Sequence, residues 1–243
     1  MKLRLRFSKT GKVRWTSHRD LARMWERAFR RTQLPLAYST GFTPRPKVSF
    51  GLALSTGHES VAEYLDVELD PAQLDGLDVA SLPGRLTAAL PAGVDVLAAA
   101  PLDEGAGRHH LVAARGDLVL QRAGASIGEL RQLVARGLAA ESLVITRNRK
   151  GRAVSDDVRP AIVSLTVLDE VSDGVVLAAE VTTQPRGLRP AELLGALSGG
   201  LVEVRTRRTH QWISRADGAR EEPITLLSDA RGAPPAPELE RVS

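Results

Sequence analysis

The fold is decided at the start of the chain, in "KLRLRFSKTGKVRWTSHRDLARMWERAFRRTQ", residues 2–33. The first eight of these residues alternate, with apolar side chains at every second position from Leu3 to Phe7, which predicts a half-buried strand. The "KVRW" that follows is expected to extend this strand as a ribbon. The apolar period then becomes helical, and Ser17 with Asp20 has the spacing of a capping box. A strand followed by an amphipathic helix therefore opens the chain.

The elements after this opening repeat one order. The patterns predict strands at 48–54 and 61–69, a helix at 79–90 and a strand at 93–100. The second series is a strand or a hairpin at 110–121, a helix at 126–140 and a strand running into a basic turn at 142–152. Strands at 161–170 and 174–183, a helix at 189–200 and a strand at 201–213 follow. We therefore predict an α+β chain of tandem ferredoxin-like (β-α-β-β-α-β) halves with antiparallel sheets. The predicted boundaries are 1–104 and 105–213 for the halves, and 214–243 for a mostly irregular or disordered tail.

A sheet with helices on one face leaves its other face open, and RNA-recognition modules bind single strands on such a face. Here the first strand offers Lys2, Arg4 and Arg6 on that side, without the aromatic residue that those modules use.

Positive charge is concentrated near the N-terminus. Residues 1–50 hold thirteen Lys and Arg against two acidic residues, a net charge of +11, whereas the whole chain is +4. Such a field attracts phosphate polymers or an acidic partner, although a solvated basic helix face is the common alternative. Arg19, Arg23, Arg27 and Arg30 lie opposite the apolar stripe of the first helix, and we predict that they contact nucleic acid.

A second candidate surface is "GFTPRPKVSFG", residues 41–51. Its two prolines favour a stiff, extended backbone, which places Arg45 and Lys47 on one side. These cations would hold a phosphate and Phe42 would stack a base. Alternatively, the stretch is a rigid crossover plugged by its phenylalanines. Acidic residues nearby, Glu59, Glu63 and Asp66, are expected to pair with its cations.

Further basic residues occur late in the chain, in "TRNRKGR" (146–152) and "RTRRTHQW" (205–212). Arg149, Lys150, Arg207 and Arg208, with an aromatic residue near them, suit a groove for single-stranded nucleic acid. A charged edge strand protected against aggregation is the alternative.

Several chemistries find no support in the sequence. The chain has no cysteine, which excludes disulfides, thiolate zinc sites and cysteine-ligated iron–sulfur clusters. The histidines lack zinc-site spacing, and no phosphate-binding glycine motif or nucleophile elbow occurs. We therefore predict no cofactor and no metal. No apolar run approaches the ~20 residues of a membrane helix, and the N-terminus lacks a signal-peptide core, so we expect a cytoplasmic protein with no membrane partner.

His18, in "SHRD", is the one weak catalytic candidate. It lies at the edge of the apolar stripe, beside basic residues, where it would serve as a general base in metal-independent RNA cleavage. The alternative role is a hydrogen bond that closes the start of the helix.

Three motifs carry a family resemblance: "SHRDL" (17–21), "PLAYSTGF.PRPK.SF" (35–50) and "ESVAEYLDVEL" (59–69). With them the chain resembles an uncharacterised domain family linked to radical SAM proteins, a domain of unknown function. Its members occur alone or as a C-terminal extension of a cobalamin-binding radical SAM protein. The match is strongest over the first 70 residues and looser in "RKGRAVSDDVRPAI" (149–162). The resemblance implies a radical SAM partner, which would supply any radical chemistry.

Three functions remain open at this point. The first is a non-catalytic RNA-binding or substrate-presenting accessory module for a radical SAM partner. The second is a metal-independent RNA-processing enzyme, similar to CRISPR repeat-processing endoribonucleases, which also pair two ferredoxin-like halves. The third is a scaffold whose basic face meets an acidic protein.

Overall fold

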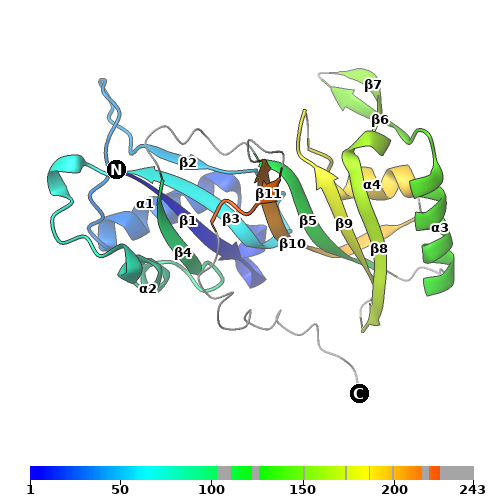
Figure 1. Ribbon diagram of the computed structural model, residues 1–243, viewed down its shortest axis with the longest axis horizontal. Helices are drawn as coiled ribbons and strands as arrows, with labels where there is room; N and C mark the ends of the chain where they lie inside the picture. The colour runs from blue at the N-terminus through cyan, green and yellow to red at the C-terminus, as the bar shows by residue number, and fades with distance from the viewer. Residues whose placement is uncertain are drawn as a thin grey trace. The chain divides into compact units, whose positions relative to one another are not determined.

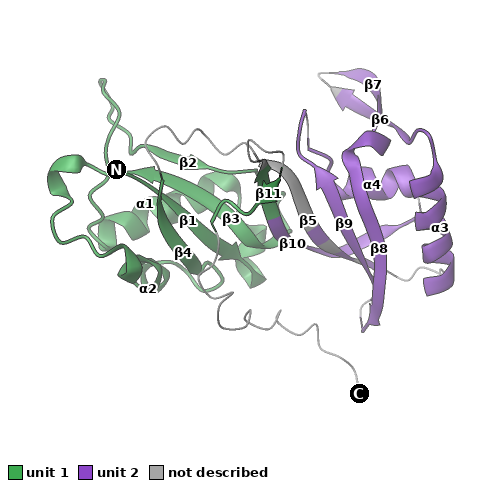
Figure 2. Cartoon of the chain, in the orientation of Figure 1, with its two compact units in different colours: residues 1–111, 211–231 green, residues 112–210, 232–243 purple. Residues whose placement is uncertain are grey.

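The computed structural model describes residues 1–102, 111–121, 126–149, 151–172, 174–185, 187–198, 200–214 and 219–224. The chain divides into two compact units (Figure 2). Unit 1 comprises Met1–Leu111 and Gln211–Arg231, and unit 2 comprises Val112–His210 and Gly232–Ser243. Each unit combines helices with antiparallel strand pairs, so the predicted α+β class is confirmed. The predicted ranges 1–104, 105–213 and 214–243 stay predictions of domain organisation.

Unit 1 has the predicted order of elements (Figure 1). These are β1 (Lys2–Lys9), α1 (His18–Arg31), β2 (Val48–Phe50), β3 (Glu59–Glu68), α2 (Leu82–Ala89) and β4 (Val96–Leu102). Strand β1 lies between β4 and β3, and β2 pairs with β3; all these pairs are antiparallel. The end of β10 (Val202–Ser214) lies beside β3, and the two-residue β11 (Arg220–Glu221) pairs with β10.

The core of unit 1 lies between the sheet and its two helices. Ser17 starts α1 as predicted, because its hydroxyl accepts a hydrogen bond from the backbone N–H of Asp20 at 3.1 Å. Trp25 of α1 is fully buried, with its ring edge-on to Phe7 at 5.0 Å and tilted against Phe29 at 5.3 Å. Burial of this apolar stripe turns the opposite side of α1 outward.

The other face of the unit 1 sheet is covered, so the expectation of an open basic face is wrong for two of its three residues. Arg4 is buried and donates two hydrogen bonds to Asp66, at 2.8 and 3.0 Å. Arg6 is buried and donates to Glu222 at 2.6 Å. Lys2 alone of the three is exposed. Part of the cover comes from residues 219–224, more than two hundred positions away in the chain, where Glu222 contacts Arg6 and Ile224 packs with Tyr64.

Unit 2 contains four main strands and two helices. The elements are β5 (Leu111–Gln121), α3 (Ile127–Ala139), β6 (Val144–Arg149), β7 (Arg152–Asp157), β8 (Ile162–Val171), β9 (Gly174–Thr182), α4 (Pro190–Leu197) and the first part of β10. The main sheet has the order β10-β5-β9-β8, and its core packs against α3 and α4. The predicted capping box at Ser126 and Glu129 is present.

Two local predictions are corrected, and a third is extended. Residues 11–15 form a 3-10 helix rather than a ribbon, because the buried carboxylate of Glu59 accepts the Gly11 N–H at 2.9 Å and holds the turn. The helix predicted from residue 79 begins at Leu82, after a short 3-10 turn. The strand predicted to run into a basic turn over 142–152 is β6, and it pairs with β7 in a hairpin that forms its own two-stranded sheet.

Candidate nucleic-acid interface

The four predicted arginines of α1 are all exposed. Arg23 makes an ion pair with Asp20 one turn away at 3.5 Å, with both side chains about half exposed. Arg19, Arg27 and Arg30 have no ion pair within the part of the chain that the structure describes. Three guanidinium groups on one helix thus face solvent with their charge uncompensated by a carboxylate.

The proline-containing stretch forms a narrow hairpin, which we call the arm and define as residues 37–47 (Figure 1). The Ser39 N–H donates to the Arg45 carbonyl at 2.8 Å, and the Lys47 N–H donates to the Ala37 carbonyl at 2.9 Å. Phe42, at the tip, is as exposed as a side chain can be, so it does not plug a core. The extended backbone agrees with the prolines, but the chain doubles back instead of crossing over.

The two cations of the arm, Arg45 and Lys47, differ in their contacts. Arg45 is exposed, whereas the ammonium of Lys47 pairs with Glu68 at 3.0 Å. That hydrogen bond, together with the nearby charges of Lys47 and Lys2, lowers the pKa of the Glu68 carboxyl. We expected Glu59, Glu63 and Asp66 to pair with the arm.

The observed pairs are different ones. Glu59 pairs with Arg14 at 3.2 Å, and Asp66 pairs with Arg4. The pairing of strands decides which acid meets which cation, because Asp66 lies directly opposite Arg4 in the β1–β3 register.

Two exposed aromatic residues were missed by sequence reasoning. Trp15 is 64% exposed, with the Arg14 guanidinium 5.4 Å from its ring, and Tyr38 of the arm is 53% exposed. Large aromatic rings are seldom left in water without use, and base stacking is one use. The signal available in the sequence was the scarcity of aromatic residues, which make up only 4% of the chain.

The second basic group is less available than predicted. Arg147 of β6 pairs with Asp156 and, at 3.3 Å, with Glu192. Arg207 and Arg208 of β10 are only partly exposed, and both have interaction partners. Arg149 ends β6, and Lys150 lies outside the described residues. The described cations of this second group are therefore less accessible than the arginines of α1.

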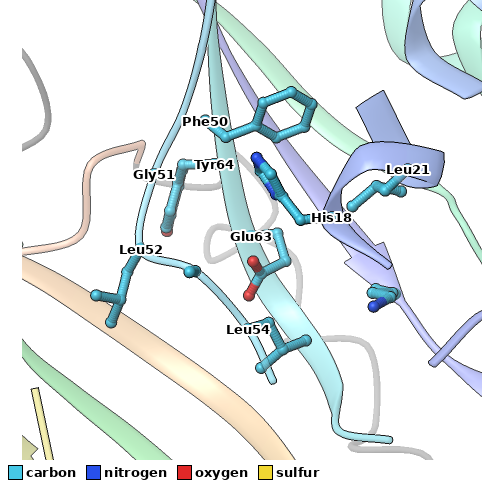
Figure 3. Close-up of a pocket in the computed structure, with 10 residues that line it drawn as sticks. His18, Leu21, Phe50, Gly51, Leu52, Leu54, Glu63 and Tyr64 are labelled. Carbon is cyan, nitrogen blue, oxygen red and sulfur yellow. The ribbon is translucent and has the colours of Figure 1, made fainter. Parts of the chain in front are cut away.

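A small pocket lies beneath the first turn of α1 (Figure 3). His18 and Phe50 lie at its mouth with their rings edge-to-face at 4.9 Å, and His18 is exposed. Lys9 and Glu63, both buried, line its interior. The cavity of about 20 Å³ has room for one water molecule, so a substrate would meet these groups only at the mouth.

Lys9 is the unusual residue of this pocket. Its ammonium donates a hydrogen bond to the Thr16 carbonyl at 3.0 Å. Burial lowers the pKa of Lys9, while the negative charge of Glu63 acts in the opposite direction. Burial likewise raises the pKa of Tyr64, which also lines the pocket. Sequence reasoning missed Lys9 as a site residue, although Lys9 is in phase with the buried Leu5 and Phe7.

Metal-binding clusters and membrane-spanning helices are both absent from the residues that the structure describes. Among them, no group of three or more His, Asp or Glu side chains is arranged to hold a metal ion. Within the same residues, no helix has the length and apolar character needed to cross a membrane.

The comparison with family models is decisive for membership. Residues 2–190 match the family described as "Uncharacterized protein conserved in bacteria (DUF2344)". The chain belongs to this family. The match is to an uncharacterised bacterial family, and the link to radical SAM proteins that the motifs imply stays a prediction. No curated protein matches the chain.

Among solved structures, the chain is similar to one in the "Crystal Structure of a Cbf5-Nop10-Gar1 Complex", with 15% identity and a TM-score of 0.45. The similarity covers 86% of this chain and 48% of that one. A second similar chain is in the "Structure of H/ACA RNP bound to a substrate RNA containing 2'-deoxyuridine", with 15% identity and a TM-score of 0.42, covering 86% and 47%. The chain thus spans about half the length of each. At these TM-scores the similarity assigns no function or partner to this DUF2344 protein.

Proposed function

We propose that this DUF2344 protein is a non-catalytic RNA-binding module, whose contact surface is the exposed arginine side of α1 together with the arm. The observation that carries the proposal is the contrast between the two sides of α1. Leu21, Trp25 and Phe29 are buried on one side, while Arg19, Arg27 and Arg30 are exposed on the other without a carboxylate partner in the described part of the chain.

Phosphate is the ligand chemistry that such a surface favours. Arginine binds phosphate with planar, bidentate geometry, and a row of guanidinium groups along a helix follows a charged backbone. The exposed rings of Trp15, Tyr38 and Phe42 add stacking surfaces, which distinguish a single strand with open bases from a duplex. A module of this kind positions its ligand without changing it.

The proposed test is the salt dependence of binding to a labelled single-stranded RNA, measured by fluorescence anisotropy. Each phosphate contact steepens the slope of log affinity against log salt by about 0.7 on a single strand. Arg19→Ala with Arg27→Ala should therefore flatten the slope by about one unit or more.

The matched control is Arg131→Ala with Arg136→Ala. It removes the same charge from two exposed arginines of α3 in unit 2, and we expect its slope to equal that of the wild type. Equal slopes for all three proteins would refute the assignment of α1. Absence of binding by the wild type at low salt would refute RNA binding itself and favour the protein-scaffold alternative.

We also propose that both units are ferredoxin-like and that the chain serves a radical SAM partner. The layout is supported by two strand orders, β4-β1-β3-β2 in unit 1 and β10-β5-β9-β8 in unit 2, which follow the same arrangement when numbered within each unit. The partner is supported by the sequence motifs alone. Co-purification of the tagged chain from its own cells would test it, and recovery without any radical SAM protein would count against it.

A second candidate function, metal-independent RNA cleavage, is favoured by one observation: the pocket brings Lys9 and Glu63 next to His18. In this reaction His18 would take the proton of a 2′-hydroxyl, whose oxygen then attacks the adjacent phosphorus. The bond from phosphorus to the 5′-oxygen breaks, and the 5′-oxygen takes a proton from solvent water. The products are a 2′,3′-cyclic phosphate and a 5′-hydroxyl. Incubation with RNA in the presence of a chelator tests it: intact RNA, or equal cleavage by His18→Gln, would exclude this role.

A further inference from the structure

A second cavity of unit 1 lies between the last turns of α1 and α2. It measures about 230 Å³ and is lined by Met24, Arg27, Arg31, Ala89, Leu90 and Pro91. An apolar cavity of roughly 150 Å³ is enough to take up a benzene ring. This one therefore has room for a flat heterocycle, and it opens to solvent beside exposed arginines.

The walls of the cavity combine two chemistries. Met24 and Leu90 form an apolar floor and also pack against the core of unit 1. Arg27 and Arg31 are exposed at its edge. An occupant that matches both needs a flat or apolar body and a negative charge attached to it.

The cavity is held open by hydrogen bonds between the helix ends. Arg31 donates to the Ala89 carbonyl at 3.3 Å, and Arg85 of α2 donates to the Thr32 carbonyl, just after α1, at 2.8 Å. The bond to Ala89 restrains the Arg31 guanidinium at the cavity, so less conformational freedom is lost when a ring stacks on it. Bases commonly stack on arginine planes in single-stranded RNA sites.

The position of Arg27 connects the cavity to the proposed contact surface. A cation in the last turn of a helix complements the helix dipole, which gives Arg30 and Arg31 a structural role in addition to any contact with a ligand. Arg27 lies one turn earlier, where this explanation no longer holds, and it has no carboxylate partner among the described residues. It belongs both to the row of α1 arginines and to the cavity edge.

We propose that this cavity is a nucleotide subsite, which takes the base of one unpaired RNA nucleotide while Arg27 holds its phosphate. The inference rests on the proposed RNA binding and deepens it, because it names the ligand unit that the surface recognises. It predicts that an open base adds to the affinity, separately from the charge-dependent contact between Arg27 and the phosphate.

Filling the cavity tests the proposal. Ala89→Phe places a ring in the cavity without changing any charge, and Ala88→Phe adds the same ring at the neighbouring exposed position, which does not line the cavity. We expect Ala89→Phe to weaken binding of the full chain to a uridine dodecamer about fivefold or more, with the salt slope unchanged. Ala88→Phe should bind like the wild type, and an RNA duplex should bind all three proteins equally.

A fluorescent base gives an independent readout. 2-Aminopurine within a single-stranded oligonucleotide is dim because it stacks on its neighbours, so insertion of the base into the cavity should brighten it. The rise should occur with the wild type and with Ala88→Phe, and should be absent with Ala89→Phe. Ala89→Leu is the smaller filling variant, and its tryptophan fluorescence will report whether the fold is kept.

The other possible outcomes refute either the nucleotide subsite alone or RNA binding as well. Equal RNA affinity of Ala89→Phe and Ala88→Phe would remove the subsite while leaving RNA binding in place. A loss in Ala89→Phe that is as large for the duplex would show a general distortion of α1 and also refute the subsite. Absence of RNA binding by the wild type would remove both proposals. Binding of a leucine- and glutamate-containing peptide that Ala89→Phe abolishes would assign the cavity to an acidic protein partner.

Discussion

Glu222 lies near the C-terminal end of the described chain, but its replacement by alanine (Glu222→Ala) should destabilise unit 1 strongly. The Glu222 carboxylate accepts the Arg6 hydrogen bond at 2.6 Å, and the two side chains are only 22% and 7% exposed. When the Glu222 carboxylate is removed, the Arg6 guanidinium keeps one weaker hydrogen bond within the described residues, to the Val61 carbonyl at 3.3 Å. Breaking a buried ion pair costs about 3–5 kcal/mol, and the partial exposure of Glu222 reduces this to about 2–4 kcal/mol.

Removing the other partner of this ion pair should lower the free energy of unfolding by less. Arg6→Leu leaves the Glu222 carboxylate unpaired at a position that water reaches, so a loss of about 1–2 kcal/mol is expected. Arg6→Leu with Glu222→Leu removes both charges, and the double variant should recover to within about 1 kcal/mol of the wild type. Glu26→Ala, an exposed change on α1, serves as the control and should stay within about 0.5 kcal/mol.

The assay is urea unfolding followed by tryptophan fluorescence. All three tryptophans, Trp15, Trp25 and Trp212, belong to unit 1, so the signal reports this unit and not unit 2. A Glu222→Ala protein within 0.5 kcal/mol of the wild type would refute the reasoning. The segment around Glu222 would then contribute nothing to stability, and the basic face of the unit 1 sheet would be open after all.

Two further predictions concern the same unit. Gly93→Ala should lower the free energy of unfolding by more than about 3 kcal/mol, because φ is +91° and an added Cβ would lie 2.4 Å from the Thr10 carbonyl oxygen. Gly76→Ala, with φ of +74° and open space around it, should cost only about 1 kcal/mol in the same urea assay. Glu68 has a folded-state pKa below its usual 4.5, so its contribution to stability is present above pH 4.5 and is lost as the pH falls through the folded-state value. Lys47→Ala should therefore differ from the wild type at pH 6 and approach it in acid; a constant difference in unfolding free energy down to the lowest folded pH would contradict this pairing.

Local patterns were enough to predict much of unit 1. The alternation from Leu3 to Phe7 and the helical stripe through Trp25 each describe a buried face, and both faces are buried in the structure. The Ser17 cap was predictable because a cap involves residues only three positions apart. Features of this kind depend on short-range chemistry, which a single sequence contains.

What the sequence did not reveal depends on long-range pairing. Arg6 faces away from the core, and only the arrival of residue 222 turns that exposed position into a buried one. Lys9 and Glu63 come together because the β1–β3 register aligns Phe7 with Glu63. The sequence nonetheless contained a signal. Lys9 occupies the next position in the alternation of buried residues through Leu5 and Phe7, and Glu63 occupies the same face of β3 as the buried Leu65. A charged residue at a core position of a strand is therefore a signal that sequence reasoning can use beside exposed basic residues.

The same reasoning changes how the charge of the N-terminal segment is interpreted. The net +11 of residues 1–50 counts every cation equally, but the structure neutralises several of them with acids from later in the chain. The cations with such partners are Lys2, Arg4, Arg6, Arg14 and Lys47. Their partners contribute to the −7 of the remaining sequence, so much of the apparent asymmetry is internal pairing. Within residues 1–50, the exposed cations that have no ion pair among the described residues lie on α1 and at Lys12 and Arg45. A ligand attracted by the field of this segment is therefore drawn to those positions and not to the sheet.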